Sequence, residues 1–293
     1  MEYIPAKTIV YHDKSKDWFA GDYKMNIYKG CDHGCIYCDS RSDCYQVESF
    51  DTIRAKQNAL TIIRDDLRRK IKPGVVVTGA ASDPYNRFEE ELCLSRHALE
   101  LINAYGFGAG IATKSPLVAR DGDILADIAS HSPVIIKMTI TCADDELCRK
   151  IEPHVAPSSQ RFAALRTLAD KGLYTGILMM PLLPGLTDNA DNVRAIIHQA
   201  KEAGARFIYP AFGLTMRSGQ REYLYRQLDR LFPGMREQYQ KRYGERYYCP
   251  SPQAKKLHAI FVKDCDEQGI LHRMSDIVKS YRMGYGDNQL TFF

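Results

Sequence analysis

The chain has 293 residues, of which 45% are hydrophobic and 26% charged, and its net charge is +4. These values exclude a disordered or fibrous protein, and so mild a charge identifies no partner. Residues 1–5 lack the basic flank and apolar run of a secretory signal. The most apolar stretch, residues 176–183, is much shorter than the roughly 20 residues of a membrane helix. We therefore expect a cytoplasmic protein without a membrane segment.

Short apolar runs alternate with amphipathic helical stretches from about residue 23 to residue 212. Strands are predicted at 24–28, 75–78, 110–113, 134–140, 174–179 and 206–211, and helices at about 52–71, 158–172 and 188–204. Such alternation predicts an α/β fold in which helices surround a parallel sheet. Six units are too few for an eight-unit barrel, so we expect a partial (β/α)6 barrel, with its chemistry at the carboxyl ends of the strands.

The pattern changes near residue 215, which predicts a barrel domain over 1–215 and a helical carboxyl-terminal extension over 216–293. Between residues 216 and 256 the extension carries ten basic residues, four acidic residues and six tyrosines. It is either a cap over the open side of the barrel, with tyrosines packed inward, or a nucleic-acid surface. In the second case basic side chains follow the phosphates and aromatic rings stack on the bases. The two interpretations are compatible.

The densest group of metal-binding residues lies directly after the first predicted strand and reads Gly30-Cys31-Asp32-His33-Gly34-Cys35-Ile36-Tyr37-Cys38. Thiolates are soft ligands that suit iron–sulfur clusters or zinc. Three of them can bind three irons of a cubane and leave the fourth iron open to an external amine and carboxylate. Nine cysteines without an export signal also indicate a reducing compartment, where clustered thiols favour metal or redox chemistry over disulfides.

The main alternative at this motif is a zinc site with three cysteines and His33. The remaining cysteines include Cys142, Cys148, Cys249 and Cys265, none of which has the spacing of a further cluster motif. We therefore expect Cys31, Cys35 and Cys38 to be the metal ligands and expect no second iron–sulfur centre.

The CxxxCxxC spacing, with Tyr37 before the third cysteine, resembles the signature of the radical S-adenosylmethionine (SAM) superfamily. The wider context, residues 26–39, resembles its spore photoproduct lyase-like branch, which is related to DNA repair photolyases. The resemblance covers residues 20 to about 215. It implies a [4Fe–4S] cluster and SAM as cofactors, and a reductant such as flavodoxin or ferredoxin. One electron from the cluster would cleave SAM into methionine and a 5′-deoxyadenosyl radical, which abstracts hydrogen from a substrate.

The same resemblance implies a set of SAM contacts. Ser82 and Asp83 match the loop near the amino end of SAM, Lys114 matches a lysine that pairs with its carboxylate, and hydroxyls at Thr139 and Thr141 would reach the ribose. Glu152 and Arg161 resemble polar residues beside SAM, and Tyr37 belongs to the motif itself. Without the resemblance these residues have ordinary structural interpretations: a helix cap, a solvated lysine, β-branched strand residues and exposed helix charges.

One position departs from the pattern. Ala80 stands where spore photoproduct lyases carry the cysteine that returns a hydrogen atom to the product, and alanine cannot donate one. Direct reversal of a thymine dimer by that route is therefore not implied. Cys44 and Cys93 are weak candidates for the missing donor, and a buried structural cysteine is the alternative interpretation of each.

Three functions remain open from the sequence. The first is a radical SAM enzyme, lyase or otherwise, that acts on nucleic acid or a nucleotide-like substrate. The second is a radical SAM enzyme that modifies a peptide or a small molecule. The third is a zinc-stabilised nucleic-acid-binding module without catalysis.

Overall fold

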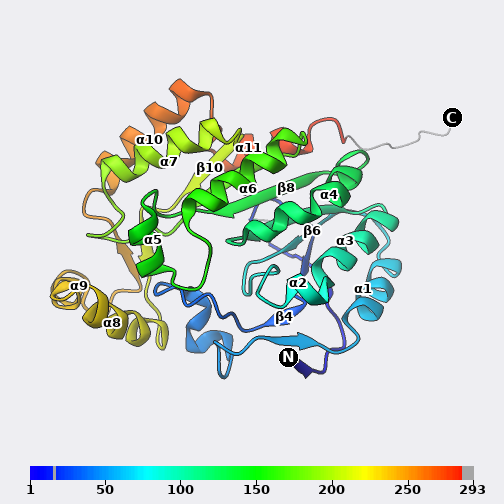
Figure 1. Cartoon of the computed structure of the whole chain (residues 1–293), viewed down its shortest axis with the longest axis horizontal. Coiled ribbons are helices and arrows are strands. Elements are labelled where there is room, and N and C mark those ends of the chain that lie inside the picture. Colours follow the sequence, from blue (N-terminus) through cyan, green and yellow to red (C-terminus); the bar gives the residue numbers. More distant parts are fainter. Residues whose placement is uncertain (16–17, 286–293) are drawn as a thin grey trace.

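A curved, mostly parallel sheet forms the centre of the computed structural model, which describes residues 1–15 and 18–285 (Figure 1). The sheet has seven strands in the order β10-β9-β8-β7-β6-β3-β2, and only β2 at the edge runs antiparallel to its neighbour. The strands are β2 (Val10–His12), β3 (Tyr23–Met25), β6 (Val75–Thr78), β7 (Gly108–Thr113), β8 (Val134–Thr139), β9 (Thr175–Met179) and β10 (Phe207–Pro210). Six parallel strands with an open edge on each side make the partial barrel that was predicted.

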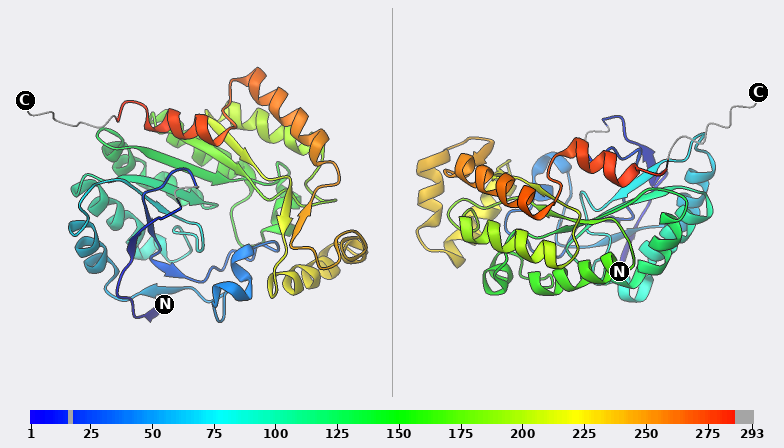
Figure 2. Two further views of the ribbon diagram at one scale, coloured as in Figure 1. Left: turned by 180° about the vertical axis from the view of Figure 1, so that it is seen from behind. Right: turned by 90° about the horizontal axis from the view of Figure 1, so that it is seen from above.

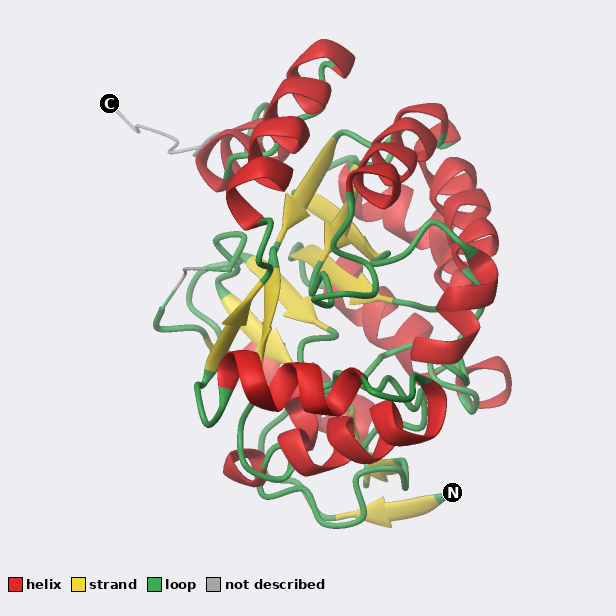
Figure 3. Ribbon diagram, turned by 90° about the vertical axis from the view of Figure 1, so that its left-hand side faces the viewer, coloured by secondary structure: helices red, strands yellow, loops and turns green. Residues whose placement is uncertain are grey.

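Helices cover the outer, convex face of the sheet (Figures 1 and 3). They are α1 (Ala59–Arg68), α2 (Glu89–Leu92), α3 (Leu94–Ala104), α4 (Gly122–Ala129), α5 (Asp145–Ile151), α6 (Ser158–Asp170) and α7 (Ala190–Glu202). Short 3-10 turns are η1 (Asp39–Arg41), η2 (Asp43–Tyr45) and η3 (Pro116–Asp121). The α/β fold expected from the sequence, with helices outside a mostly parallel sheet, is therefore confirmed.

One predicted element was too long. The helix expected at about 52–71 is α1, which begins at Ala59, and the residues before it form strand β5 (Arg54–Lys56). Strand β5 lies between β1 (Glu2–Ile4) and β4 (Tyr28–Lys29) in a separate three-stranded sheet. These partners are distant in sequence, so helical periodicity alone could not show that backbone pairing would replace the first turns of the helix.

Side chains of the strands alternate between two hydrophobic cores. On β8, Ile136 and Met138 face the helices and join the main core, whereas Ile135 faces the inner, concave side. The inner core also contains Phe19 from the loop before β3 and Phe207 from β10. The barrel interior is thus filled near its amino-terminal end by a loop that precedes the first parallel strand.

The carboxyl-terminal segment surrounds the barrel on two sides. Its elements are β11 (Gly213–Thr215), α8 (Gln220–Leu231), α9 (Met235–Tyr243), β12 (Tyr248–Pro250), α10 (Ala254–Gln268) and α11 (Met274–Arg282). Figure 2 shows α8 and α9 projecting at one end, while α10 lies along α7 and α11 crosses the inner face. Phe261 of α10 joins the main core, and Tyr281 of α11 joins the inner core. The division at residue 215 stays a prediction.

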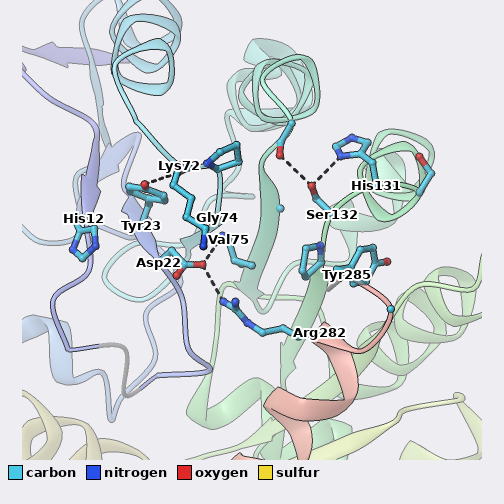
Figure 4. Close-up of a pocket in the computed structure, with 16 residues that line it drawn as sticks. His12, Asp22, Tyr23, Lys72, Gly74, Val75, His131, Ser132, Arg282 and Tyr285 are labelled. Carbon is cyan, nitrogen blue, oxygen red and sulfur yellow. Dashed lines mark hydrogen bonds and ion pairs between the residues drawn. The ribbon is translucent and has the colours of Figure 1, made fainter. Parts of the chain in front are cut away.

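A cavity of about 770 Å³ opens at the amino-terminal ends of the strands, away from the cysteine motif (Figure 4). Its polar groups satisfy one another: the Asp22 carboxylate accepts hydrogen bonds from Val75 N at 2.9 Å and Arg282 at 3.0 Å, and Ser132 donates to Gly106 O. Within residues 1–15 and 18–285, no helix is long and apolar enough to cross a membrane.

Lys137 of β8 carries a charged side chain that is among the largest fully buried groups of the described residues. It is 1% exposed, points to the inner core, and its Nζ lies 5.0 Å from the centre of the Phe19 ring with no hydrogen-bond partner in the described chain. Burial lowers the pKa of this ammonium group from 10.5 to about 7. Below pH 7 the folded protein must therefore bury a charge that the unfolded chain leaves in water.

We predict that Lys137→Met raises the free energy of unfolding, and more so at low pH. Between pH 7 and 10.5 the unfolded chain keeps the proton that the folded protein has lost, so the wild-type protein gains stability as pH rises. The advantage of the variant should therefore shrink by roughly 2–3 kcal/mol between pH 6 and pH 9. Urea unfolding at both pH values checks this, with the exposed Lys150→Met as control. An equal advantage at both pH values would contradict it.

Candidate functional site

The cysteine motif forms a loop between β4 and η1 at the carboxyl ends of the strands. Gly30 begins it with a φ of +84°, and a Cβ there would lie 2.3 Å from Thr52 O, so glycine is required. Two backbone hydrogen bonds then hold the loop against the segment after β8: Ile36 N donates to Ile151 O at 3.0 Å, and His154 N donates to His33 O at 3.2 Å. Because Cys31 N also donates to Phe50 O at 2.8 Å, the protein itself holds the loop on two sides.

The three thiols lie close enough to influence one another electrostatically. Burial raises the pKa of Cys31 to about 12 and raises that of Cys35 well above its usual value, with smaller contributions from the other thiols of the loop. The backbone N–H groups of His33 and Asp83 act in the opposite direction on the pKa of Cys31. Metal binding displaces the protons that burial otherwise retains.

The residues present fit a cluster and its external ligand. Three soft sulfur donors lie on one short loop, which suits a cubane in which each thiolate binds a different iron. Among the described residues, no three His, Cys, Asp or Glu side chains are grouped tightly enough to hold a single metal ion. At the end of β8, the Thr141 hydroxyl oxygen is buried and has no hydrogen-bond partner within the described part of the chain. A hydroxyl-bearing ligand would supply the missing partner.

The loop after β6 brings Asp83 under the motif. Gly79 has a φ of +93°, and a Cβ at this position would lie 1.8 Å from Ala112 O, so the loop can cross β7 only with glycine here. The Asp83 carboxylate accepts hydrogen bonds from the Thr113 hydroxyl at 2.7 Å and from Lys114 N at 2.8 Å. Asp83 therefore joins the loops after β6 and β7, and its carboxylate also lies 3.7 Å from His33 Nδ1 in the cysteine loop.

Lys114 points toward the cysteine loop rather than into open solvent. Its Nζ lies 5.7 Å from the centre of the Tyr37 ring. Burial alone would lower the pKa of its ammonium group, but the charges of Cys35 and Glu152 outweigh burial and raise this pKa. A lysine held protonated beside the cluster loop can pair with a carboxylate ligand.

The buried ion pair of Glu152 and Arg161 holds the hydroxyl end of Tyr37. Its hydroxyl donates to Glu152 Oε1, and Glu152 Oε2 lies 2.6 Å from an Nη of Arg161. Both members of the pair have fully buried side chains. Arg161 also donates to Thr139 O at 3.0 Å and to Ala156 O at 2.7 Å. Burial would raise the pKa of the Glu152 carboxyl, but Arg161 and Lys114 outweigh it and keep this pKa below its usual value.

The sequence-predicted site residues fall into three groups. Lys114, Asp83, Tyr37 and Glu152 come together around the cysteine loop, while Arg161 lies behind Glu152. Thr139 and Thr141 lie at and just beyond the end of β8, and Ser82 is partly exposed on the β6 loop. Direct contact of these residues with SAM stays a prediction.

The two weak candidates for a hydrogen donor lie elsewhere. Cys44 is exposed on η2, where Arg217 donates to its sulfur at 3.0 Å, and Cys93 lies between α2 and α3 beside Arg120. A catalytic role for either cysteine stays a prediction.

The sequence did not predict the contacts between the cysteine loop and the carboxyl-terminal segment that begins with β11. The Gln220 side chain donates to Tyr37 O at 2.9 Å, and the Thr215 hydroxyl donates to Asp39 Oδ1 at 2.9 Å. Arg217 lies 3.3 Å from the same Asp39 oxygen. The signal in the sequence was weak, because these residues lie about 180 positions after the motif and belong to no pattern of their own.

Comparison with known proteins places this geometry in a family. The model of the radical SAM superfamily matches residues 25–200, which is more than half of the chain. The chain belongs to the radical SAM superfamily. Rv2578c of Mycobacterium tuberculosis is 28% identical over 274 residues, which cover 91% of this chain and 76% of that protein.

Solved structures show the same fold at low identity. A spore photoproduct lyase variant with bound AdoMet and dinucleoside spore photoproduct superposes with a TM-score of 0.65 at 16% identity, and the match covers 89% of this chain and 78% of the other. The methyltransferase TsrM of Kitasatospora setae, with cobalamin and a [4Fe–4S] cluster, gives 0.57 at 12%, covering 92% and 62%. As a radical SAM protein, this chain uses a [4Fe–4S] cluster and SAM as cofactors.

We predict that Arg161→Met lowers the free energy of unfolding by about 3–5 kcal/mol, because it leaves the Glu152 carboxylate buried without its partner. The double variant Glu152→Gln/Arg161→Met should recover part of this loss, since it removes the uncompensated charge. Urea unfolding of the metal-free protein measures both. Strictly additive losses in the double variant would show that the two residues are not coupled.

Proposed function

We propose that this protein is a radical SAM enzyme whose cluster is bound by Cys31, Cys35 and Cys38 and which acts on a nucleic-acid or nucleotide-like substrate. When reduced, the cluster supplies the electron that cleaves SAM into methionine and a 5′-deoxyadenosyl radical. The observation that carries the first part is that three thiols, the Lys114 ammonium group and the buried Thr141 hydroxyl, which has no hydrogen-bond partner among the described residues, lie at the carboxyl ends of the strands. This is the end at which parallel barrels carry their chemistry.

The residues of this chain have separate tasks in the proposed reaction. Lys114 would pair with the SAM carboxylate. The Thr141 hydroxyl would form a hydrogen bond with a hydroxyl of the nucleoside. Tyr37 is held in one orientation by Glu152, so its ring is available to pack against the cofactor without losing rotational freedom on binding. Asp83 fixes the backbone from which Lys114 extends.

The surface next to the last cysteine supports the substrate class. Arg217 lies 3.3 Å from Asp39, the residue that directly follows the last cysteine. Its guanidinium carbon is 5.8 Å from the centre of the Tyr45 ring and 5.1 Å from the centre of the Tyr247 ring. Tyr45 is 44% exposed and Tyr247 is 51% exposed. Exposed rings beside a guanidinium group form the kind of platform on which bases stack and phosphates bind.

Three of the other tyrosines of the extension pack inward, as in the cap interpretation, whereas Tyr248 is 48% exposed. Tyr225, Tyr239 and Tyr243 are buried, and the last two donate to Pro184 O and Pro250 O. The extension is thus both a packed cover and a carrier of the exposed aromatic platform. All nine cysteines are free thiols, which supports a reducing, cytoplasmic compartment.

We do not extend the proposal to direct dimer reversal. Ala80 is exposed on the β6 loop, and its methyl group cannot return a hydrogen atom to a product radical. The substrate decides whether the reaction is a lyase reaction or another radical conversion. A peptide or a small molecule is the alternative substrate class.

The central test is reductive SAM cleavage. After anaerobic reconstitution with iron and sulfide and reduction with dithionite, the wild-type protein should form 5′-deoxyadenosine. Cys35→Ala should bind markedly less iron and lose this activity, whereas Cys249→Ala, at a buried cysteine outside the motif, should retain both. A wild-type protein that binds one zinc tightly and never consumes SAM would contradict the proposal.

Lys114→Met should weaken binding of SAM to the cluster-loaded, unreduced protein by roughly tenfold or more, because an ion pair with the carboxylate is lost. Iron content should stay at the wild-type level, which separates loss of SAM binding from loss of the cluster. Calorimetric titration measures the affinity. Unchanged affinity would remove Lys114 from the proposed site.

The substrate class is tested by binding of a labelled single-stranded oligonucleotide, measured by fluorescence anisotropy at 50 and 200 mM salt. Tyr247→Ala should weaken binding by about 1–3 kcal/mol if a base stacks on the ring. Tyr3→Ala, at an exposed tyrosine on β1, is the control. Absent or salt-insensitive binding by the wild-type protein would instead favour a peptide or small-molecule substrate.

A further inference from the structure

Lys137 is a buried polar group that the proposed reaction does not yet use. Its side chain points into the barrel, because its neighbours Ile136 and Met138 on β8 face the outer helices. Its Nζ has no hydrogen-bond partner within the described part of the chain. A buried nitrogen without a partner costs stability, which an apolar residue of similar length would avoid. A costly polar group of this kind indicates a ligand that supplies the missing partner.

Lys137 has small neighbours on the adjacent strands and aromatic rings on its amino-terminal side. In the register of the sheet it lies next to Ala112 of β7 and Gly176 of β9. Its Nζ lies 5.0 Å from the centre of the Phe19 ring, and the rings of Phe19 and Phe207 are 5.6 Å apart. These two rings, which we call the floor, close the barrel interior below the lysine.

Solvent reaches the inner face of the sheet above the floor, toward the carboxyl ends of the strands. The next inward-facing row joins Thr139 of β8 to Leu178 of β9, and Leu178 to Tyr209 of β10. Thr139 is 8% exposed and Tyr209 is partly exposed. Both rings of the floor are 0% exposed. The accessible part of the barrel interior therefore ends between the row of Thr139 and the row of Lys137.

The side chain of Lys137 is long enough to cross this step. Thr139 follows two residues later on the same strand, which is a distance of about 6.6 Å. The flexible four-carbon stem of lysine covers about this length. Nζ breaks no hydrogen bond within the described chain when it moves. A change of rotamer therefore brings its N–H donors to the level of Thr139, beside which SAM is proposed to lie.

The surroundings of Lys137 favour a carbonyl oxygen as the group that it binds. The floor and Leu178 are apolar, so the faces of a planar base can pack there, whereas a phosphate would exchange its hydration for a single cation. A carbonyl oxygen at the edge of a base needs a donor once it is buried. The ammonium group and the neutral amine both carry N–H donors, so this contact does not require a charge.

We propose that Lys137 determines which base this enzyme accepts, by donating a hydrogen bond to a carbonyl oxygen of a base that has entered the barrel. Enzymes that carry out chemistry on a base take it out of the stack, which exposes its edge to such a donor. Thymine, cytosine and guanine carry a carbonyl oxygen, and adenine has none. The inference rests on the nucleic-acid substrate class given under Proposed function.

The first experiment compares labelled oligothymidylate with oligoadenylate of equal length. Fluorescence anisotropy measures both affinities on protein that holds its cluster and SAM and is not reduced. The two strands also differ in stacking and stiffness, so the readout is the change in the ratio of the two affinities. Lys137→Met should lower the ratio of thymidylate to adenylate affinity by about tenfold, because only thymine loses a hydrogen bond.

Lys137→Met is a suitable variant because it removes a destabilising group, and urea unfolding confirms that it is folded. The matched control is Lys150→Met, at a half-exposed lysine of α5, which should leave the ratio at the wild-type value. An unchanged ratio in Lys137→Met would overturn the inference and leave the proposed function standing. Failure of the wild-type protein to bind either strand would overturn the proposed substrate class, and this inference with it.

A second experiment locates the base by cross-linking. One 5-formyluracil in the oligothymidylate carries an aldehyde that condenses with a nearby lysine amine, with loss of water, and cyanoborohydride reduces the imine to a stable amine. At pH 8 the amine of Lys137 is largely neutral, because burial lowers its pKa to about 7. Mass spectrometry should find the cross-link on Lys137. Cross-links on other lysines and none on Lys137 would overturn the inference.

Discussion

A buried ion pair between Glu152 and Arg161 is the interaction on which the geometry of the site depends. Arg161 projects from α6, Glu152 follows α5, and the pair holds the hydroxyl of Tyr37 in the cysteine loop. Charges without access to water are stable only when each is matched and hydrogen-bonded. The cysteine loop, the residue after α5 and helix α6 must therefore come into contact for the ion pair to be stable. This requirement positions the loop on the barrel.

The cysteine loop is held on two further sides, and each has a different physical origin. The Asp83 carboxylate lies 3.7 Å from His33 Nδ1 in the loop and accepts a hydrogen bond from Lys114 N after β7. Gln220 reaches it from the extension, more than 180 residues later, and accounts for a buried carbonyl that would otherwise lack a donor. The extension is consequently part of the construction of the site, whatever substrate it contacts.

The two faces of the loop differ in their chemistry. Beyond Cys38, exposed tyrosines and Arg217 form an aromatic surface next to the extension. Between Cys31 and Cys35, the loop faces a polar cavity that is also lined by Arg87 and by Arg230 of α8.

The sequence by itself determined the fold class, five of the six parallel strands to within about two residues, and the cysteine motif. These features depend on local sequence: short continuous apolar runs in the strands, glycines at forced left-handed turns, and thiols three and four positions apart. It did not determine that β5 would replace the start of a helix, that Arg161 would lie behind Glu152, or that Lys137 would be buried without a partner. Each of those outcomes depends on segments distant in the chain, and only the tertiary structure brings such segments into contact.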